Sequence, residues 1–276
     1  MPSCLGKPSV PSPPRQLDAA RLVVHHALQI IAIGACRTLL PARDDDSHTA
    51  LEWDAAGRRW LCDALPTSGL RPGLRPEDLT LTLGDASFPL IGKTREDGLA
   101  WLRRQLADAG HDADAIHLDF HYEMPSHPIE AGAPFDDLRD AYAEIAAYFD
   151  DSFQLLTALR DSLPEDPVIL TWPHHFDMAM LLELGPRADD RARYIGIGMA
   201  PGDDHIDQPY LYVTPQPAPD ENAALPALPH GVWQRKPFFG AILTAEDWLR
   251  GSDAEQQQRA SAYLAEAVRG GRALLG

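Results

Sequence analysis

Hydrophobic residues recur at helical spacing in two long segments of the chain. Residues 17–40 ("LDAARLVVHHALQIIAIGACRTLL") are mostly apolar, and Arg21, His25 and Gln29 form one polar stripe at intervals of four residues. Residues 136–163 repeat large apolar side chains every three or four positions, and a proline follows the segment. Both segments therefore predict amphipathic helices, the first with this stripe as its polar face.

Further helices are indicated where a hydroxyl residue is followed three positions later by an acid, the pattern of a capping box. The pairs are Thr94/Asp97, Thr244/Asp247 and Ser252/Glu255. The first of these helices is expected to end near Gly110 and the second at Trp248. The third is expected to end at about Arg269, because Gly270-Gly271 follows and glycine is typical of helix C-termini.

Strict alternation of apolar and polar residues predicts a β-strand in "AIHLDFHYEM", residues 115–124. One face would carry Ile116, Leu118, Phe120 and Tyr122, and the other His117, Asp119, His121 and Glu123. Two hairpins are expected earlier in the chain, one turning at residues 54–57 and the other around Gly84-Asp85.

Four more strands are predicted in the second half, at "PVILTWP", "HHFDMAMLLELG", "RYIGIGMA" and "QPYLYVTP". The second of these also fits a short helix, since Pro173 suits a helix start and Gly185-Pro186 a helix end. Local propensity slightly favours that helix, and the resemblance described below favours the strand.

The order helix, four strands, helix occurs in residues 17–110 and again in residues 136–270, which suggests the hypothesis of a duplicated unit. Mostly short connections favour an α+β fold of antiparallel sheets with helices packed on one side. We expect a disordered Pro/Ser-rich tail at residues 1–16 and two α+β halves, 17–125 and 126–276, packed as one globular unit. The Pro-rich "MPSHPIEAGAP" separates the halves.

Part of the sequence resembles a bacterial family of uncharacterised proteins. The similar features are "PVILTWPHHFDMAMLLELG" after a long helix, the later "QPYLYVTPQP", and the middle section from "GLAWLRRQLADAGHDADAIHLDFHYEMPSHPIEAGAPFDD". The resemblance spans about residues 20–220. It implies a fold with a strand at "HHFDMAMLLELG", and it implies no mechanism, because the family has no assigned activity.

The formal net charge of −17 argues against nucleic acid or an anionic membrane as a partner. No apolar run approaches the ~18 residues of a membrane helix, and the N-terminus lacks the apolar core of a secretory signal. Cys4, Cys36 and Cys62 are widely spaced and odd in number, so we expect no disulfide framework and no zinc site. Cys36 is interpreted as a buried thiol, and the protein as an acidic cytoplasmic one.

A divalent metal site is one candidate for function. If residues 172–184 form a strand, His175 and Asp177 share a face, about 7 Å apart at Cα. Were that strand next to residues 115–124, Asp119 and His121 could join them as a mixed nitrogen and oxygen ligand set. The competing interpretation, which we favour, is that these residues are the solvated faces of antiparallel sheets.

A ligand pocket lined by aromatic rings is the second candidate. Its residues would be Trp172, His174, Phe176, Tyr210 and Tyr212. The alternative is that these rings fill the core. The acidic runs at residues 44–46 and 203–207 are interpreted as surface segments.

No GxSxG, HExxH or GxxxxGK[ST] motif occurs in the sequence. The preferred interpretation is a binding module for a small molecule or a protein, without catalysis. The alternative is a metal-dependent hydrolase that uses the His/Asp set. The sequence gives neither the ligand nor the oligomeric state.

Overall fold

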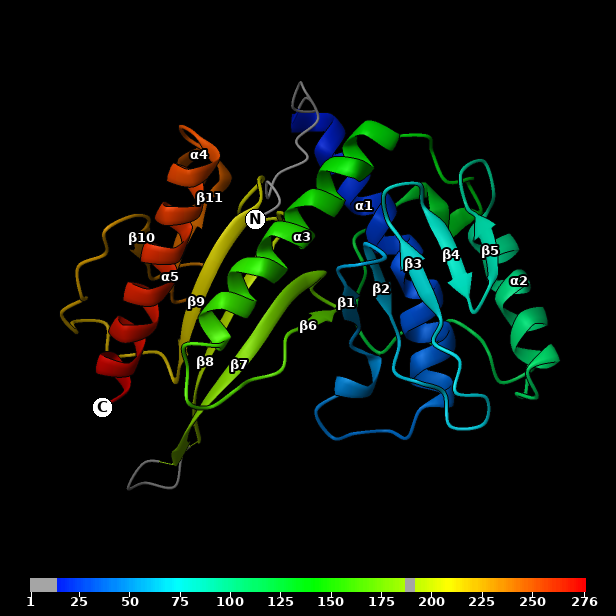
Figure 1. The fold of residues 1–276 in the computed structure, drawn as a ribbon, viewed down its shortest axis with the longest axis horizontal. Coiled ribbons are helices and arrows are strands. Elements are labelled where there is room, and N and C mark those ends of the chain that lie inside the picture. The colour runs from blue at the N-terminus through cyan, green and yellow to red at the C-terminus, as the bar shows by residue number, and fades with distance from the viewer. Residues whose placement is uncertain (1–13, 187–191) are drawn as a thin grey trace. The chain divides into compact units, whose positions relative to one another are not determined.

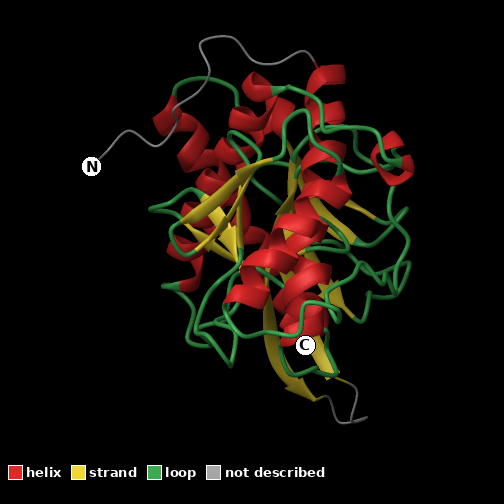
Figure 2. Cartoon of the chain, turned by 90° about the vertical axis from the view of Figure 1, so that its right-hand side faces the viewer, coloured by secondary structure: helices red, strands yellow, loops and turns green. Residues whose placement is uncertain are grey.

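The computed structural model describes residues 14–186 and 192–276. Most of the expected N-terminal tail lies outside these residues. Helices account for 37% of the chain and strands for 22%, arranged as two antiparallel sheets with helices (Figure 2). The predicted α+β class is therefore confirmed.

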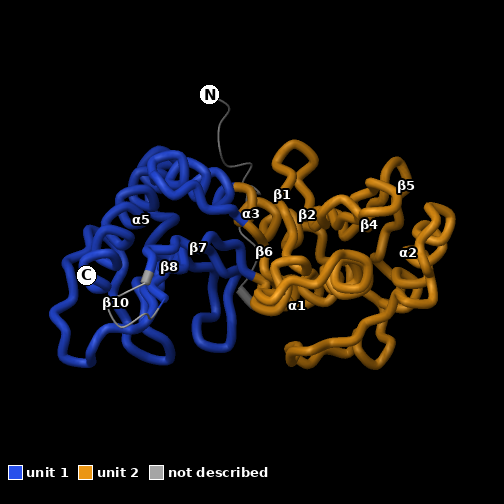
Figure 3. The backbone as a smooth tube through the Cα atoms, turned by 90° about the horizontal axis from the view of Figure 1, so that it is seen from below, with its two compact units in different colours: residues 1–6, 151–169, 177–276 blue, residues 7–150, 170–176 orange. Residues whose placement is uncertain are grey.

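The chain divides into two compact units (Figure 3). What we call the N-terminal unit comprises residues 7–150 and 170–176, and the C-terminal unit comprises mainly residues 151–169 and 177–276. The boundary between the units lies within the helix that contains residues 150 and 151. The boundary predicted from the sequence was the Pro-rich connection before that helix. Each unit is described separately below.

The N-terminal unit is built from one long helix, a small sheet and a second helix (Figure 1). Its elements are α1 (Pro14–Ile31), η1 (Ala32–Arg37), η2 (Ser47–Thr49), β1 (Glu52–Asp54), β2 (Arg59–Leu61), β3 (Gly73–Arg75), β4 (Thr80–Leu83), β5 (Ala86–Pro89), α2 (Arg95–Asp108), η3 (Pro128–Ala131), the first half of α3 (Arg139–Arg160) and β6 (Leu170–Trp172). Strands β1 to β5 form an antiparallel meander in chain order. Both predicted hairpins are confirmed, with Asp54 opposite Arg59 and Leu83 opposite Ala86.

Helix α1 is buried along nearly its whole length, and the prediction of a polar stripe on its surface is wrong. His25 is 3% exposed and Gln29 is completely buried. Both side chains donate to the carbonyl oxygen of Pro173, at 2.7 and 2.8 Å. A buried polar group is tolerated when it is hydrogen-bonded, so this stripe attaches the turn after β6 to α1.

The segment Gln16–Arg37 is long and apolar enough to cross a membrane, which the sequence analysis did not expect. A helix in the core of a globular unit has the same length and composition, and most of this segment is buried within the chain. The segment ends in a π-helical turn, η1, where α-helical hydrogen bonding gives way to wider spacing.

Residues 115–124 form no strand, so this prediction is wrong; residues 116–120 have no regular secondary structure and residues 121–122 form a bend. The alternation itself is real, because Ile116 is completely buried while its neighbour His117 is exposed. Side chains replace the missing neighbouring strand: Arg103 donates to the carbonyl oxygen of Ile116 at 2.7 Å, and Arg37 donates to that of Asp119. Alternation records which face of an extended chain is covered, not whether its backbone is paired in a sheet.

The C-terminal unit contains the larger sheet and the last helices. Its elements after α3 are β7 (Asp177–Pro186), β8 (Ala192–Ala200), β9 (Tyr210–Gln216), β10 (Val232–Gln234), β11 (Gly240–Thr244), α4 (Ala245–Trp248) and α5 (Asp253–Leu275). Within this unit the strands of the sheet have the order β10-β11-β9-β8-β7, and α5 packs along β8, β9 and β11 (Figure 1). The strand interpretation of "DMAMLLELG" is confirmed, and the helical alternative is wrong.

The capping boxes of α2 and α5 form as expected, while Thr244 caps α4 without a side-chain bond. Helix α5 does not end at Gly270-Gly271 but continues to Leu275. A Cβ on Gly270 would lie 3.1 Å from the Trp233 ring, and one on Gly271 would lie 3.2 Å from Ile195. The two glycines therefore serve close packing of the helix on the sheet and are not a terminator.

The order helix, sheet, helix does repeat along the chain, but the sheets have five and six strands instead of four each. Their strand orders also differ, since β10 and β11 exchange places relative to a meander. The duplication stays a hypothesis in this coarser form.

Candidate functional site

A cleft of about 340 Å³ in the N-terminal unit gathers seven polar or charged side chains that the sequence did not group together. They are Arg37, Thr38, Arg43, Asp46, His48, His117 and Asp119. We call this cavity the His48 cleft. Its volume is at the lower end of the range for small-molecule sites, about 300–1,000 Å³.

One wall of the cleft is the π-helical turn η1. The turn is buried from Ala32 to Cys36, and Arg37 is its first residue with a partly exposed side chain. The Arg37 guanidinium donates to the backbone oxygen of Asp119 and lies 3.5 Å from the Asp119 carboxylate. Because π-helical turns shift the phase of the residues that follow them and are frequent at functional sites, η1 is a local device that directs Arg37 toward the cleft.

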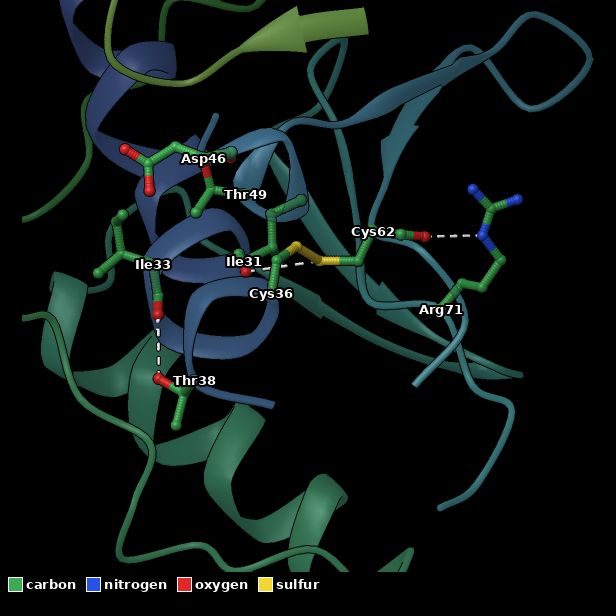
Figure 4. The surroundings of a disulfide bond; sticks show 8 residues. All are labelled: Ile31, Ile33, Cys36, Thr38, Asp46, Thr49, Cys62 and Arg71. Atoms are coloured by element: carbon green, nitrogen blue, oxygen red, sulfur yellow. Dashed lines mark hydrogen bonds between the residues drawn. A yellow bond between two sulfur atoms is a disulfide. The ribbon is translucent and has the colours of Figure 1, made fainter. Parts of the chain in front are cut away.

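A disulfide between Cys36 and Cys62 attaches this turn to the end of β2 (Figure 4). The two Cα atoms are 5.9 Å apart and both residues are completely buried. The expectation of a free Cys36 thiol and no disulfide is therefore wrong. The pairing joins residues 26 positions apart, and no spacing motif marks it. Disulfides are typical of oxidising compartments, so the cysteine argument for a cytoplasmic location no longer holds.

His48 lines the cleft and is 5% exposed. It lies in the short 3-10 helix η2, and its Nδ1 atom accepts a hydrogen bond from the backbone N–H of Arg43 at 3.2 Å. An imidazole that accepts at Nδ1 carries its proton at Nε2. No partner for Nε2 is found among the described residues, so this donor remains for a group in the cleft.

The electrostatic surroundings keep His48 uncharged. Burial is the main cause that lowers the pKa of its imidazole, with Arg37 and Arg43 acting in the same direction and Asp46 against them. A neutral ring at neutral pH is consistent with its accepting bond at Nδ1, since a protonated ring could not accept there.

Asp46 supplies a carboxylate to the cleft and has a left-handed backbone conformation, with φ of 57°. This conformation is unfavourable for residues other than glycine, least so for Asp and Asn. Its Oδ2 atom lies 3.1 Å from the Nε2 atom of His121. The sequence-based prediction was that residues 44–46 form a surface segment, and Asp46 was not selected as a candidate site residue. Three consecutive aspartates carry no signal that distinguishes the one that lines a cleft.

The predicted metal ligands are placed differently from one another. Asp119 lies in the cleft wall, His121 pairs with Asp46, and His175 is exposed with its ring 4.2 Å from that of His174. Asp177 is buried in the C-terminal unit. Within the described residues, no three His, Cys, Asp or Glu side chains are grouped so that they could hold a metal ion.

The backbone conformation explains why the predicted metal ligands do not share strand faces. Asp119 and His121 belong to a segment without regular secondary structure that bends at residues 121–122, and residues 173–176 form a turn in which Phe176 has φ of 54°. The alternation that would have put His175 and Asp177 on one strand face is therefore interrupted between them.

The residues of the predicted aromatic pocket divide between the two units. Phe176 is 1% exposed and packs in the core against His25, whose ring is stacked on it at 5.0 Å. Trp172 and His174 are half-buried in the same unit, with ring centroids 6.0 Å apart. A pocket made by all five residues stays a prediction.

The two tyrosines of that set, on β9, each donate to a carboxylate in the C-terminal unit. Tyr210 donates to Asp203 at 2.5 Å, and Tyr212 donates to Asp177. Asp203 also accepts from the backbone N–H groups of His205 and Ile206. The acidic loop is thus a hydrogen-bonded turn, as the surface interpretation expected.

No family model matches the chain, and neither the curated proteins nor the solved structures contain a match to it. The resemblance to a bacterial family of uncharacterised proteins therefore stays an expectation. Function has to be argued from the geometry of the residues themselves.

Proposed function

We propose that this protein is a binding protein for a small polar molecule, without catalysis, and that the molecule occupies the His48 cleft. The observation that carries the proposal is the His48 ring, which is 5% exposed and has its Nδ1 atom bonded to the backbone of Arg43. The Nε2–H donor of this ring has no partner among the described residues and faces the cleft lining, so a ligand in the cleft can accept a hydrogen bond from it.

The walls of the cleft are held by contacts that do not need a ligand. The Cys36–Cys62 disulfide fixes the turn that carries Arg37. The hydrogen bond from Arg37 to the backbone oxygen of Asp119 fixes the segment that carries Asp119. A site whose walls are already ordered loses less conformational entropy on binding. This rigidity supports a binding site in preference to an incidental surface depression.

The chemistry of the lining favours binding over catalysis. The Thr38 hydroxyl at the cleft donates to the backbone oxygen of Ile33 at 3.2 Å, so its proton is held by the helix and not by a base. Cys36 and Cys62 are consumed by the disulfide and supply no thiolate. The alternative of a metal-dependent hydrolase has less support, because its ligand set is not grouped among the described residues.

The experiment is a screen of small polar molecules by thermal shift and ¹⁵N–¹H NMR on the wild-type protein and on Arg43→Gln. The matched control is Arg104→Gln, which removes the same charge from an exposed position of α2 outside the cleft. A ligand that binds the wild type and Arg104→Gln but binds Arg43→Gln at least about tenfold more weakly supports the proposal. Equal affinity for all three proteins, or no ligand from the screen, would count against it.

A further inference from the structure

The His48 cleft is lined by two cationic and two anionic side chains: Arg37 and Arg43 against Asp46 and Asp119. The formal charge of this lining is zero, whereas the whole chain carries −17. A cleft so composed does not attract a single sign of charge. A ligand that pairs with both the cationic and the anionic side chains has to carry a negative and a positive group.

Two side chains of the lining can donate to an anionic group. His48 offers Nε2–H from a nearly buried ring. The Arg43 guanidinium is 56% exposed and only loosely held, at 3.3 Å from the Ser47 hydroxyl and 3.5 Å from the Asp63 carboxylate. Guanidinium groups bind carboxylates through parallel N–H donors, so Arg43 can turn toward a ligand without losing a strong internal bond.

Other side chains of the lining can accept from a cationic group. Asp46 uses Oδ2 for His121, and its Oδ1 atom has no partner among the described residues. The Thr38 hydroxyl donates to Ile33, which leaves its oxygen lone pairs as acceptors. Asp119 has a side chain that is 71% exposed beside Arg37. An ammonium group has three donors and no acceptor, which suits a set of oxygens.

We infer that the ligand of the His48 cleft is a small zwitterion of the amino acid type, with its carboxylate on Arg43 and His48 and its ammonium group on Asp46 and Thr38. This inference rests on the proposed binding function and specifies its ligand class. A dianion of the same size is repelled by Asp46 and Asp119, and a diamine is repelled by Arg37 and Arg43. Large polyanions are also opposed by the net charge of the chain.

The test compares matched compounds that differ only in charged groups. We would titrate the full-length wild-type protein with β-alanine, with propionate, which lacks the amine, and with ethylamine, which lacks the carboxylate. The same comparison is made for the common amino acids and their deaminated and decarboxylated forms. Binding is followed by calorimetry and by the imidazole NMR signals of His48.

The expected result is that at least one amino acid binds at least about tenfold more tightly than both of its truncated forms. Asp46→Asn should lower the affinity for that amino acid and leave the affinity for its deaminated acid unchanged. Arg43→Gln should lower the affinity for both compounds. The control Arg104→Gln should leave both affinities unchanged, since Arg104 lies outside the cleft.

Three outcomes overturn the inference, and the first two separate it from the proposed function. If a deaminated acid or an amine binds as tightly as the parent amino acid, the cleft binds one charge only, and the binding function stands without the zwitterion. If no amino acid moves the His48 signals while another compound of the polar screen does, the ligand class is again wrong and the function stands. If no compound shifts the His48 signals, both the ligand class and the proposed binding function are wrong.

Discussion

The Nδ1 atom of His48 accepts a hydrogen bond from the backbone N–H of Arg43, with 3.2 Å between the two nitrogens. This contact connects the chemistry of the cleft to its backbone. It fixes the tautomer of the ring, and it fixes the loop that carries Arg43 against the 3-10 turn that carries His48. A substitution at His48 therefore affects both the ligand donor and the fold of the cleft wall.

Removal of the disulfide should destabilise the protein substantially. The double variant Cys36→Ala/Cys62→Ala loses a link between residues 26 positions apart, for which the chain-entropy estimate is about 3.5 kcal/mol in the free energy of unfolding. Urea denaturation of the wild type and the variant measures the difference. Reductant added to the denaturation series should lower the stability of the wild type and leave the variant unchanged. Equal midpoints for wild type and variant would contradict the pairing.

Acid should weaken the fold through His25. Burial lowers the pKa of this imidazole to about 3, with the carbonyl of Pro173 opposing that shift. The unfolded chain binds the proton below its ordinary pKa of 6.5, and the folded chain does not until about pH 3. The stabilisation is therefore complete above pH 6.5 and is lost as the pH falls toward 3, by up to about 1.4 kcal/mol per pH unit.

His25→Gln isolates this effect, because glutamine can donate to Pro173 but does not titrate. Its free energy of unfolding should decline less steeply than that of the wild type between pH 6.5 and 5, where few carboxylates titrate. Parallel pH profiles for the two proteins would mean that His25 does not control the acid response.

The contrast between His25 and the predicted strand shows what the sequence could and could not tell. Helical spacing located α1, and capping boxes located the starts of α2 and α5, because these signals depend on neighbours within a few residues. Whether the polar stripe of α1 faces water depends on Pro173, about 150 positions away, and no local pattern carries that information.

The bond between Tyr212 and Asp177 should contribute measurably to the stability of the C-terminal unit. Asp177 is 8% exposed and accepts from the Tyr212 hydroxyl. Tyr212→Phe removes this donor from a buried carboxylate, at an expected cost of about 1.5–3 kcal/mol. Tyr194→Phe is the matched control, since Tyr194 is 38% exposed on the neighbouring strand. Similar denaturation midpoints for the two variants would contradict this role of Tyr212.

Gly198 on β8 is required so that Tyr212 on β9 can reach Asp177 on β7. A Cβ at this position would lie 2.5 Å from the Met178 carbonyl oxygen and 2.6 Å from the Tyr212 hydroxyl. Gly198→Ala should therefore destabilise the protein by about 1–3 kcal/mol. Gly196→Ala is the milder comparison, because its close contact at 2.7 Å is the Thr214 side chain, which can rotate. An alanine at residue 198 that costs no more than one at residue 196 would contradict the argument.

The candidate site was less predictable than the fold. Asp119 lines the cleft and His121 lies beside Asp46, whereas the predicted metal set required residues 115–124 to be a strand, which they are not. Arg37, Asp46 and His48 come from a π-helical turn, a left-handed residue and a 3-10 turn. These local geometries have weak sequence signals, so the cleft that they form emerges only from the structure.

The most direct test of ligand binding at His48 is a ¹⁵N NMR spectrum of the histidine imidazoles, recorded for the free protein and during titration with the best ligand of the polar screen. We expect the His48 ring, identified by its loss in His48→Gln, to be neutral with its proton on Nε2, and we expect the Nε2 signal to shift as the ligand binds. A proton on Nδ1, or a ligand that binds while the His48 signals stay unchanged, would contradict this expectation.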